Sequence, residues 1–399
     1  MRTKEKLIII SACLLYMASA GIRTVFGVLL NIITAGTGIA YADVSSAIAI
    51  AQLVFGISQP VFGVIANKTS KRFVLMIGCL FMGAGMILIP FCEGPVALTS
   101  ALGVIMPIGT GAVSFGMIMS VVSPLLGEKK AILASGMVNA SSGVGGIVFS
   151  PVLQGLFDRS GLFVTMLVFA VYMISLIFVS ALMCGKSEEK PEVTESGDKS
   201  CVKYLLKDAF KNRSYLALVW GFFTCGYHMG IVETHLFSQI VFYGLSEGFT
   251  AIAFSIYGMA VMLGCLICGV LCNRFSMKYV LAGIFGCRVV WPVILILMPK
   301  NEVTILMIVV LLGLTGAATM TPTSGLTERL YGADNLATLF GVVFLSHQVG
   351  SFFSAWIGGL SVELTGDYII VWMVAVVLSL SAVVTTVRIK ELKNNVNKE

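Results

Sequence analysis

The chain has 399 residues, of which 57% are hydrophobic and only 12% are charged, and its mean hydropathy is +0.97. A water-soluble protein of this length needs far more polar surface, so the composition excludes a soluble globular domain. The formal net charge is +6, and its meaning depends on where the basic residues lie along the chain.

The hydrophobic residues occur in blocks of about 20, the length that a helix needs to cross a bilayer core of about 30 Å. The first block, Leu7 to Ile33, is too long for the apolar part of a secretory signal and is predicted to be a retained span. All spans are predicted to be helical, because backbone groups in lipid must be hydrogen-bonded within their own segment. The twelve predicted spans are residues 7–33, 44–66, 73–92, 96–124, 131–157, 162–184, 214–243, 250–272, 279–299, 303–325, 336–361 and 367–389.

The basic residues support this division of the chain. All but four of the 26 Lys and Arg residues fall in segments that are cytoplasmic if the N-terminus is cytoplasmic. The exceptions are Arg23 and Arg288 inside spans, and Arg159 and Lys300 in external loops. This bias is what the positive-inside rule predicts, so we expect a multi-pass protein of the cell membrane with both termini in the cytoplasm. The positive net charge then reflects orientation in the lipid bilayer and indicates no nucleic-acid partner.

The predicted domains are two halves of six spans each, residues 1–184 and 214–399. Between them, residues 185–213 are highly charged and poor in apolar side chains, which predicts a flexible cytoplasmic linker.

The two halves share sequence features at a fixed distance. The stretches GVIANKTSKRFVL and GVLCNRFSMKYVL begin 206 residues apart, at Gly63 and Gly269. Gly136 and Gly341, and then Gly161 and Gly366, are separated by 205 residues. Such an offset indicates duplicated six-helix units, a pattern typical of secondary transporters.

The loop after the second span carries a more specific pattern. The stretch from Gly63 to Arg72 resembles the signature G-x-x-x-D-x-x-G-R-R/K of the major facilitator superfamily, whose acidic and basic residues bridge helix ends and stabilise one of the alternating states. Asn67 stands where that acid is usual and Asn273 repeats the change, so the charge–charge part of this latch is expected to be weaker. The resemblance implies a gating role for Gly63, Asn67, Lys71, Arg72, Gly269, Asn273, Arg274 and Lys278.

Three further stretches resemble bacterial members of the monocarboxylate-porter and oxalate/formate-antiporter-like branch of that superfamily. They are AGIRTVFGVLL in the first span, GFFTCGYHMGIVETHL in the seventh and TLFGVVFLSHQVGSFFSAWIGG in the eleventh. The resemblance covers nearly the whole chain and implies an all-α membrane fold of twelve helices. The fourth and eighth spans lack the arginine that related transporters often carry there, so any carboxylate anchor must lie elsewhere.

Six ionisable side chains are predicted to lie at membrane depth: Arg23, His228, Glu233, His235, Arg288 and His347. Each costs about 2.5–3.5 kcal/mol there, so such groups usually face a bundle interior or an aqueous cavity. Two permanent cations, three imidazoles and one carboxylate form a positively biased set, which favours an anion as the substrate.

The two arginines differ in their expected roles. Arg23 lies in the first span, which lines the central cavity in the superfamily fold, and its guanidinium can bind a carboxylate bidentately. The alternative for Arg23 is a structural ion pair. Arg288 lies near the middle of the ninth span, which is normally peripheral, and the pair His347–Gln348 is its predicted partner. Substrate contact and a buried structural network both stay open for Arg288.

In the seventh span, the spacing separates the histidines from the carboxylate. His228 and His235 are seven residues apart and fall within about 20° of one helix face, whereas Glu233 lies about 140–160° away from them. These spacings do not fit a helical zinc site. We expect the histidine face to meet the cavity and Glu233 or His235 to carry a coupled proton. The alternative is a pair of core histidines with a structurally paired Glu233.

Together these features predict a secondary transporter that moves a small organic anion, namely a monocarboxylate, by alternating access, either as a proton symporter or as an antiporter that exchanges anions. The alternative is an exporter of drugs or neutral metabolites with the same fold. No HExxH or GxSxG motif lies in a span, so we expect no enzyme, and we expect a monomer without cofactor or metal. The predicted substrate-binding residues are Arg23, His228, His235, Arg288, His347 and Gln348, and the predicted proton-coupling residues are Glu233 and His235.

Overall fold

The computed structural model describes residues 3–184 and 199–391, and within these ranges the regular structure is entirely helical. Eleven of the helices are long and apolar enough to cross a membrane. The longest, α8 (Glu128–Cys184), is interrupted at Gly161, where the backbone has φ 74° and ψ −178°. This interruption divides α8 into the predicted fifth and sixth spans, so all twelve predicted spans coincide with helices.

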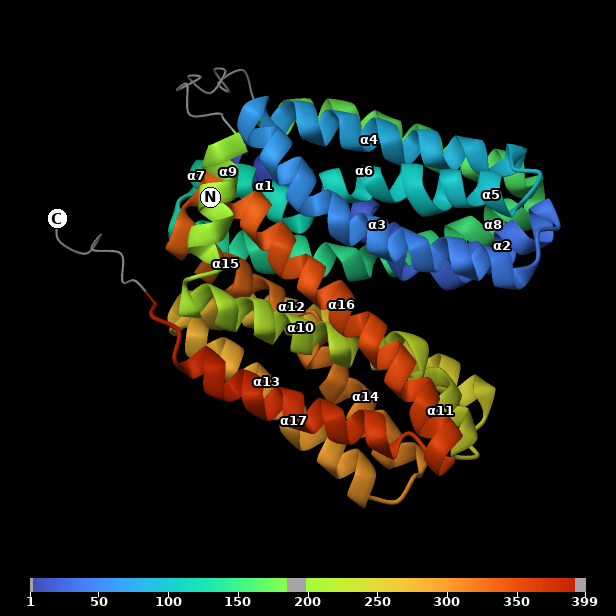
Figure 1. The fold of residues 1–399 in the computed structure, drawn as a ribbon. Coiled ribbons are helices and arrows are strands. Elements are labelled where there is room, and N and C mark those ends of the chain that lie inside the picture. Colours follow the sequence, from blue (N-terminus) through green and yellow to red (C-terminus); the bar gives the residue numbers. More distant parts are fainter. Residues whose placement is uncertain (1–2, 185–198, 392–399) are drawn as a thin grey trace. The chain divides into compact units, whose positions relative to one another are not determined.

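The chain forms two compact units, and unit 1 comprises residues 1–203 together with Ala333–Val342. Its long helices run side by side and are coloured blue to green in Figure 1. They are α1 (Thr3–Thr24), α2 (Phe26–Thr37), α3 (Tyr41–Lys68), α4 (Lys71–Leu88), the 3-10 helix η1 (Ile89–Phe91), α5 (Pro95–Leu98), the π-helix η2 (Thr99–Ile105), α6 (Met106–Ala112), α7 (Phe115–Leu126) and α8.

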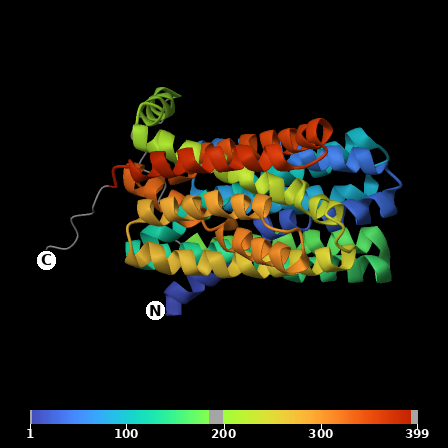
Figure 2. The same ribbon diagram turned by 90° about the horizontal axis from the view of Figure 1, so that it is seen from below.

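Unit 2 comprises residues 204–332 and 343–399, and its helices, yellow to red, also run side by side (Figure 2). They are α10 (Arg213–Thr234), α11 (Leu236–Phe242), α12 (Glu247–Arg274), α13 (Met277–Leu297), α14 (Glu302–Gly316), α15 (Met320–Tyr331), α16 (Ala333–Thr365) and α17 (Ile369–Val387). The first ten residues of α16 belong to unit 1.

The internal repeat is visible in the helix boundaries. Helices α3 and α12 each have 28 residues, and both their first and their last residues are 206 positions apart. The paired glycines Gly161 and Gly366 both adopt positive φ, at 74° and 67°. Each therefore ends a helical segment at the same place in its half, where a residue with a Cβ would be strained.

The predicted linker is only partly described by the structure, and there the prediction of a flexible segment was wrong. Residues 199–209 form the helix α9 (Lys199–Ala209). Val202, Leu205, Leu206 and Ala209 recur at helical spacing, and Ala209 is fully buried, so an apolar stripe holds this helix. The other residues of the charged stretch, 185–198, lie outside the described residues.

Four spans are discontinuous, namely the first, fourth, seventh and tenth. In each of them the helix is interrupted once by non-helical residues. These interruptions lie at Val25, at Val113–Ser114, at His235 and at Ala317–Thr319 respectively. A break inside a span frees backbone carbonyls and N–H groups that lipid cannot satisfy, so such breaks occur where protein or an aqueous cavity supplies partners. The side chains at these breaks are therefore the place to look for function.

Candidate functional site

Arg23 lies at the break in the first span, in the last turn of α1. Its Nη2 donates a hydrogen bond of 2.8 Å to Oε1 of Gln52, and its guanidinium carbon lies 3.7 Å from the centre of the Phe55 ring. Both partners come from α3 and both are neutral. They fix the direction of the guanidinium while its side chain stays half-buried, which is the arrangement expected of a preorganised anion-binding group.

The breaks in the fourth and tenth spans are repeats of one another. The sequences TGAVS and TGAAT begin 205 residues apart, at Thr110 and Thr315, and each contains the junction of its two helices. In unit 1 the Ser19 hydroxyl donates to the Thr110 carbonyl at 3.1 Å. In unit 2 the corresponding residue of the seventh span is Cys225, whose sulfur lies 3.8 Å from the Gly316 carbonyl oxygen. In both halves a side chain of the first span of that half thus contacts a backbone carbonyl that the break exposes.

Of the breaks in the fourth and tenth spans, the one in the tenth also holds a permanent charge. Arg288 on α13 is 1% exposed, and its Nη2 donates to the carbonyls of Thr315 and Gly316 at the C-terminal end of α14. A helix C-terminus carries partial negative charge, so the guanidinium stabilises this end of the broken span. The sequence predicted the pair His347–Gln348 as the partner of Arg288, whereas these hydrogen bonds go to backbone carbonyls that the break makes available.

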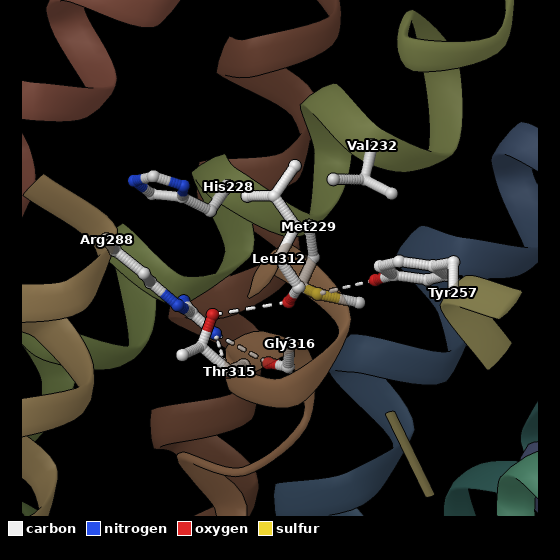
Figure 3. Close-up of a pocket in the computed structure, with 8 residues that line it drawn as sticks. All are labelled: His228, Met229, Val232, Tyr257, Arg288, Leu312, Thr315 and Gly316. Atoms are coloured by element: carbon white, nitrogen blue, oxygen red, sulfur yellow. Dashed lines mark hydrogen bonds between the residues drawn. The ribbon is translucent and has the colours of Figure 1, made fainter. Parts of the chain in front are cut away.

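A small cavity adjoins this break (Figure 3). Its volume, measured as the space open to the centre of a water molecule, is about 10 Å³. The hydroxyl of Tyr257 points to Sδ of Met229 across 3.6 Å in the same group of side chains. Four spans contribute to the cavity, which is lined by His228, Met229, Val232, Tyr257, Arg288, Leu312, Thr315 and Gly316.

His228 lies in the interior of unit 2, with 2% of its surface exposed. Its Nε2 is 2.9 Å from the Ser379 hydroxyl and 3.4 Å from the Ala375 carbonyl oxygen, both on α17, and its Nδ1 is buried without a hydrogen-bond partner among the described residues. The histidine is therefore a residue of the bundle core and adjoins the Arg288 cavity.

His235 and Glu233 lie on opposite sides of the seventh span, as the helical spacing predicted. Nε2 of His235 is 2.9 Å from the Ala355 carbonyl oxygen of α16, and Gly358 leaves room for the imidazole ring. Glu233 is exposed and interacts electrostatically with Tyr257 of α12.

His347 and Gln348 form a contact with each other on α16. Nδ1 of His347 lies 3.2 Å from Oε1 of Gln348, and the imidazole ring stacks on Phe344 with centres 5.1 Å apart. Gly226 of α10 lies against the His347 carbonyl with no room for a side chain. Helix α10 stays regular through Gly226 and Gly230, and Gly226 allows close packing against α16.

The first gating loop obtains its acidic partner from elsewhere in the chain. Lys71 at the start of α4 forms an ion pair of 3.1 Å with Asp334, in the first turn of α16, and also donates to the Ser120 carbonyl at 3.1 Å. Gly63 lies against the backbone of Thr338. Asp334 thus supplies the carboxylate that the loop lacks at Asn67, which is exposed.

The second gating loop follows the same rule. The Glu391 carboxylate, which follows α17, accepts hydrogen bonds from the Ser276 hydroxyl, from the backbone N–H of Met277 and from Arg329. Lys278 donates to the Ile389 carbonyl at 3.2 Å. The C-terminal segment therefore joins the start of α13 to the end of α15, while Arg274 is exposed and Asn273 is half-buried.

Sequence reasoning missed these two acids and the broken helices. The repeat contained a signal for the breaks and for Asp334. The stretches TGAVS and TGAAT are 205 residues apart. Glu128 and Asp334, both in the first turn of a helix, lie 206 residues apart. The nine cysteines whose side chains the structure describes are free thiols, and no group of three His, Cys, Asp or Glu residues within the described ranges could hold a metal ion.

Two duplicated bundles with a break in every third span are typical of secondary transporters. The family comparison agrees. A family model described as "Major Facilitator Superfamily" matches residues 12–355, so the chain belongs to this family of secondary transporters, and it is not an enzyme.

Several known proteins resemble the whole chain. The uncharacterized MFS-type transporter YcxA of Bacillus subtilis is 23% identical over 86% of this chain and 85% of its own length. Monocarboxylate transporter 12 of Homo sapiens is 23% identical over 82% of this chain and 69% of its own. Among solved structures, the transporter FucP in its outward conformation gives a TM-score of 0.75 at 14% identity, covering 98% of this chain and 100% of FucP. A bacterial homologue of the iron transporter ferroportin gives 0.78 at 16% identity, covering 97% and 99%. These two structures support the fold alone.

Proposed function

We propose that this protein transports a small organic anion, namely a monocarboxylate, by alternating access. The observation that carries the proposal is the geometry of Arg23, a permanent cation placed at the break of the first span. Gln52 and Phe55 hold its guanidinium in one direction, so little side-chain entropy is lost when an anion binds.

The distribution of charge supports an anionic substrate. Arg23 and Arg288 each lie beside a helix break, one in each unit, and three imidazoles add further hydrogen-bond donors. Two relatives support the same class, namely monocarboxylate transporter 12 of Homo sapiens and monocarboxylate transporter 12-B of Danio rerio. In this proposal Arg23 is the anion-binding residue of unit 1, and His235, His347 and Gln348 are the candidate substrate-binding residues of unit 2.

The two most buried candidates are assigned a different contribution. Arg288 and His228 are 1% and 2% exposed and adjoin a cavity of about 10 Å³, which is too small for an organic acid. They stabilise the break in the tenth span and shape the potential around it. This break is where the cavity-lining part of unit 2 can bend during transport.

Proton coupling is proposed for Glu233, with His235 as its partner in the same span. Glu233 is exposed on the surface of α10 and acts on Tyr257, while His235 is half-buried against α16. Symport of a proton with the monocarboxylate, or exchange of two anions, would use the same Arg23 site. Both termini are proposed to be cytoplasmic, which places both gating loops at the cytoplasmic ends of their helices.

The gating loops are proposed to control alternation through their relocated acids. Lys71 with Asp334, and Arg329 with Glu391, tie helix ends together. Each pair must separate or shift if these helix ends move, so weakening a pair changes the balance between conformations.

A thermal-unfolding screen of the purified protein tests the substrate class. Short monocarboxylates should raise the unfolding midpoint of the wild type in proportion to ligand concentration, and Arg23→Lys should reduce this response at least fivefold. Arg388→Lys is the matched control, because Arg388 is exposed at the end of α17, and it should respond like the wild type. Stabilisation by neutral drugs, with no response to any carboxylate, would favour the exporter and contradict the proposal.

A further inference from the structure

One buried donor has no role in the transport scheme above. Nη2 of Arg288 holds the two carbonyls of α14, but Nη1 is buried and has no hydrogen-bond partner among the described residues. The side chain is 1% exposed and lines the cavity at the break of the tenth span. A guanidinium donor left unpaired in an apolar interior is costly, so an acceptor is expected there.

The charge of Arg288 is also incompletely balanced. Carbonyl groups offer partial charges only, and within the described part of the chain no carboxylate forms an ion pair with this guanidinium. Glu233 influences the same region through Tyr257, but it lies on the exposed side of the seventh span. A buried cation is stable when a counter-charge accompanies it, and this site has a positive charge with space beside it.

We propose that the cavity binds one halide ion, with chloride as the physiological ligand, between Nη1 of Arg288 and the hydroxyl of Tyr257. Tyr257 lines the same cavity, and its hydroxyl has only the weak acceptor Sδ of Met229 at 3.6 Å. It can therefore turn toward an anion, which would accept a hydrogen bond from each of the two groups.

The size of the space selects a monatomic ion. About 10 Å³ is open to the centre of a water-sized particle, which is room for one such particle and not for the three heavy atoms of a carboxylate. Met229 borders the space with a flexible thioether, which can shift to admit an ion somewhat larger than water. Water itself would satisfy the donor but would leave the charge unbalanced.

Gly316 keeps this space open. A Cβ at Gly316 would lie 3.1 Å from the Tyr257 hydroxyl and 3.4 Å from Sδ of Met229, so it would occupy the position between these groups. The same residue offers its carbonyl to Arg288. The proposed halide therefore connects α12 and α13 to the end of α14, and its binding stabilises the broken tenth span.

The first test compares unfolding midpoints of the purified full chain in sodium chloride or bromide with those in sodium methanesulfonate at equal ionic strength. Halide should raise the wild-type midpoint by about 2 °C or more at saturation. Gly316→Ala and Arg288→Met should each lose most of that shift. Gly286→Ala is the matched control for the glycine, because a Cβ there meets open space. Arg388→Met is the control for the arginine, because Arg388 is exposed at the end of α17. Both should keep the shift. Equal midpoints for the wild type in halide and methanesulfonate would overturn the proposal.

The second test does not depend on the folding of any variant. Crystals of the wild type grown in sodium bromide should show an anomalous-scattering peak within hydrogen-bond distance of Nη1 of Arg288. Absence of a peak at this position at high bromide concentration would also overturn the proposal. Neither test contains a carboxylate, so a halide response without carboxylate transport would contradict the proposed function alone, and the reverse result would contradict this inference alone.

Discussion

Replacement of Glu391 by glutamine probes how the C-terminal segment holds unit 2 together. The carboxylate side chain is 9% exposed and accepts from Ser276, from the Met277 N–H at 3.2 Å and from Arg329. The amide keeps the size of the side chain but removes its charge and turns a donor toward other donors. A hydrogen bond to a charged group contributes about 1.5–3 kcal/mol, and Arg329, at 20% exposure, recovers part of its hydration. We therefore expect Glu391→Gln to lower the free energy of unfolding by about 2 kcal/mol.

Reversible denaturation in mixed micelles, followed by circular dichroism, measures this loss. Glu93→Gln is the control, because Glu93 is an exposed acid in a loop, and it should change stability by less than about 0.5 kcal/mol. The double variant with Arg329→Met should be less destabilised than the sum of the single variants, with a coupling of about 1 kcal/mol or more. If Glu391→Gln is as stable as the control and the effects in the double variant are additive, the Glu391 carboxylate does not stabilise unit 2 as described.

Three further substitutions test the packing and the loops. Gly226→Ala should prevent stable folding, because the new Cβ would overlap the His347 carbonyl; normal yield of monodisperse protein in size-exclusion chromatography would contradict this. Gly161→Ala should lower the free energy of unfolding by about 1–3 kcal/mol, since φ 74° with ψ −178° is a conformation for glycine alone. Gly155→Ala in the same helix meets open space and should raise stability by up to about 1 kcal/mol, so a loss at both positions would argue against the backbone explanation. Asp334→Asn should leave stability within about 1 kcal/mol of the wild type while increasing the accessibility of cysteines introduced along the transport path; unchanged labelling rates would exclude a gating role for this ion pair.

The positions of the spans could be predicted because each apolar block is bounded by polar residues that cannot enter lipid. The repeat was equally predictable, since the offset that links Gly161 with Gly366 also brings two positive-φ residues to equivalent places. The different surroundings of His235 and Glu233 were predicted from helical spacing, and in the structure His235 contacts α16 while Glu233 acts on Tyr257 of α12.

The helix breaks could not be predicted from hydrophobicity. Residues 315–319 are small and apolar or hydroxylated, so their composition fits a continuous span. The break is stable because residues distant in sequence supply hydrogen bonds to its backbone groups. The sequence predicted His347 and Gln348 as partners of Arg288, because sequence patterns identify side chains. In the structure Arg288 donates to the backbone carbonyls of Thr315 and Gly316. Asp334 and Glu391 were missed for a related reason. A loop motif covers only neighbouring residues, whereas Asp334 is 263 positions from Lys71 and Glu391 is 62 positions from Arg329.

Uptake of a labelled short monocarboxylate into proteoliposomes, driven by an inward proton gradient or by a preloaded anion, tests the central claim most directly. The account predicts saturable uptake by the wild type, loss of at least nine-tenths of its rate in Arg23→Lys, and wild-type rates in Arg388→Lys at equal reconstitution. Wild-type vesicles that accumulate no carboxylate under either driving force, yet transport a neutral drug, would contradict it.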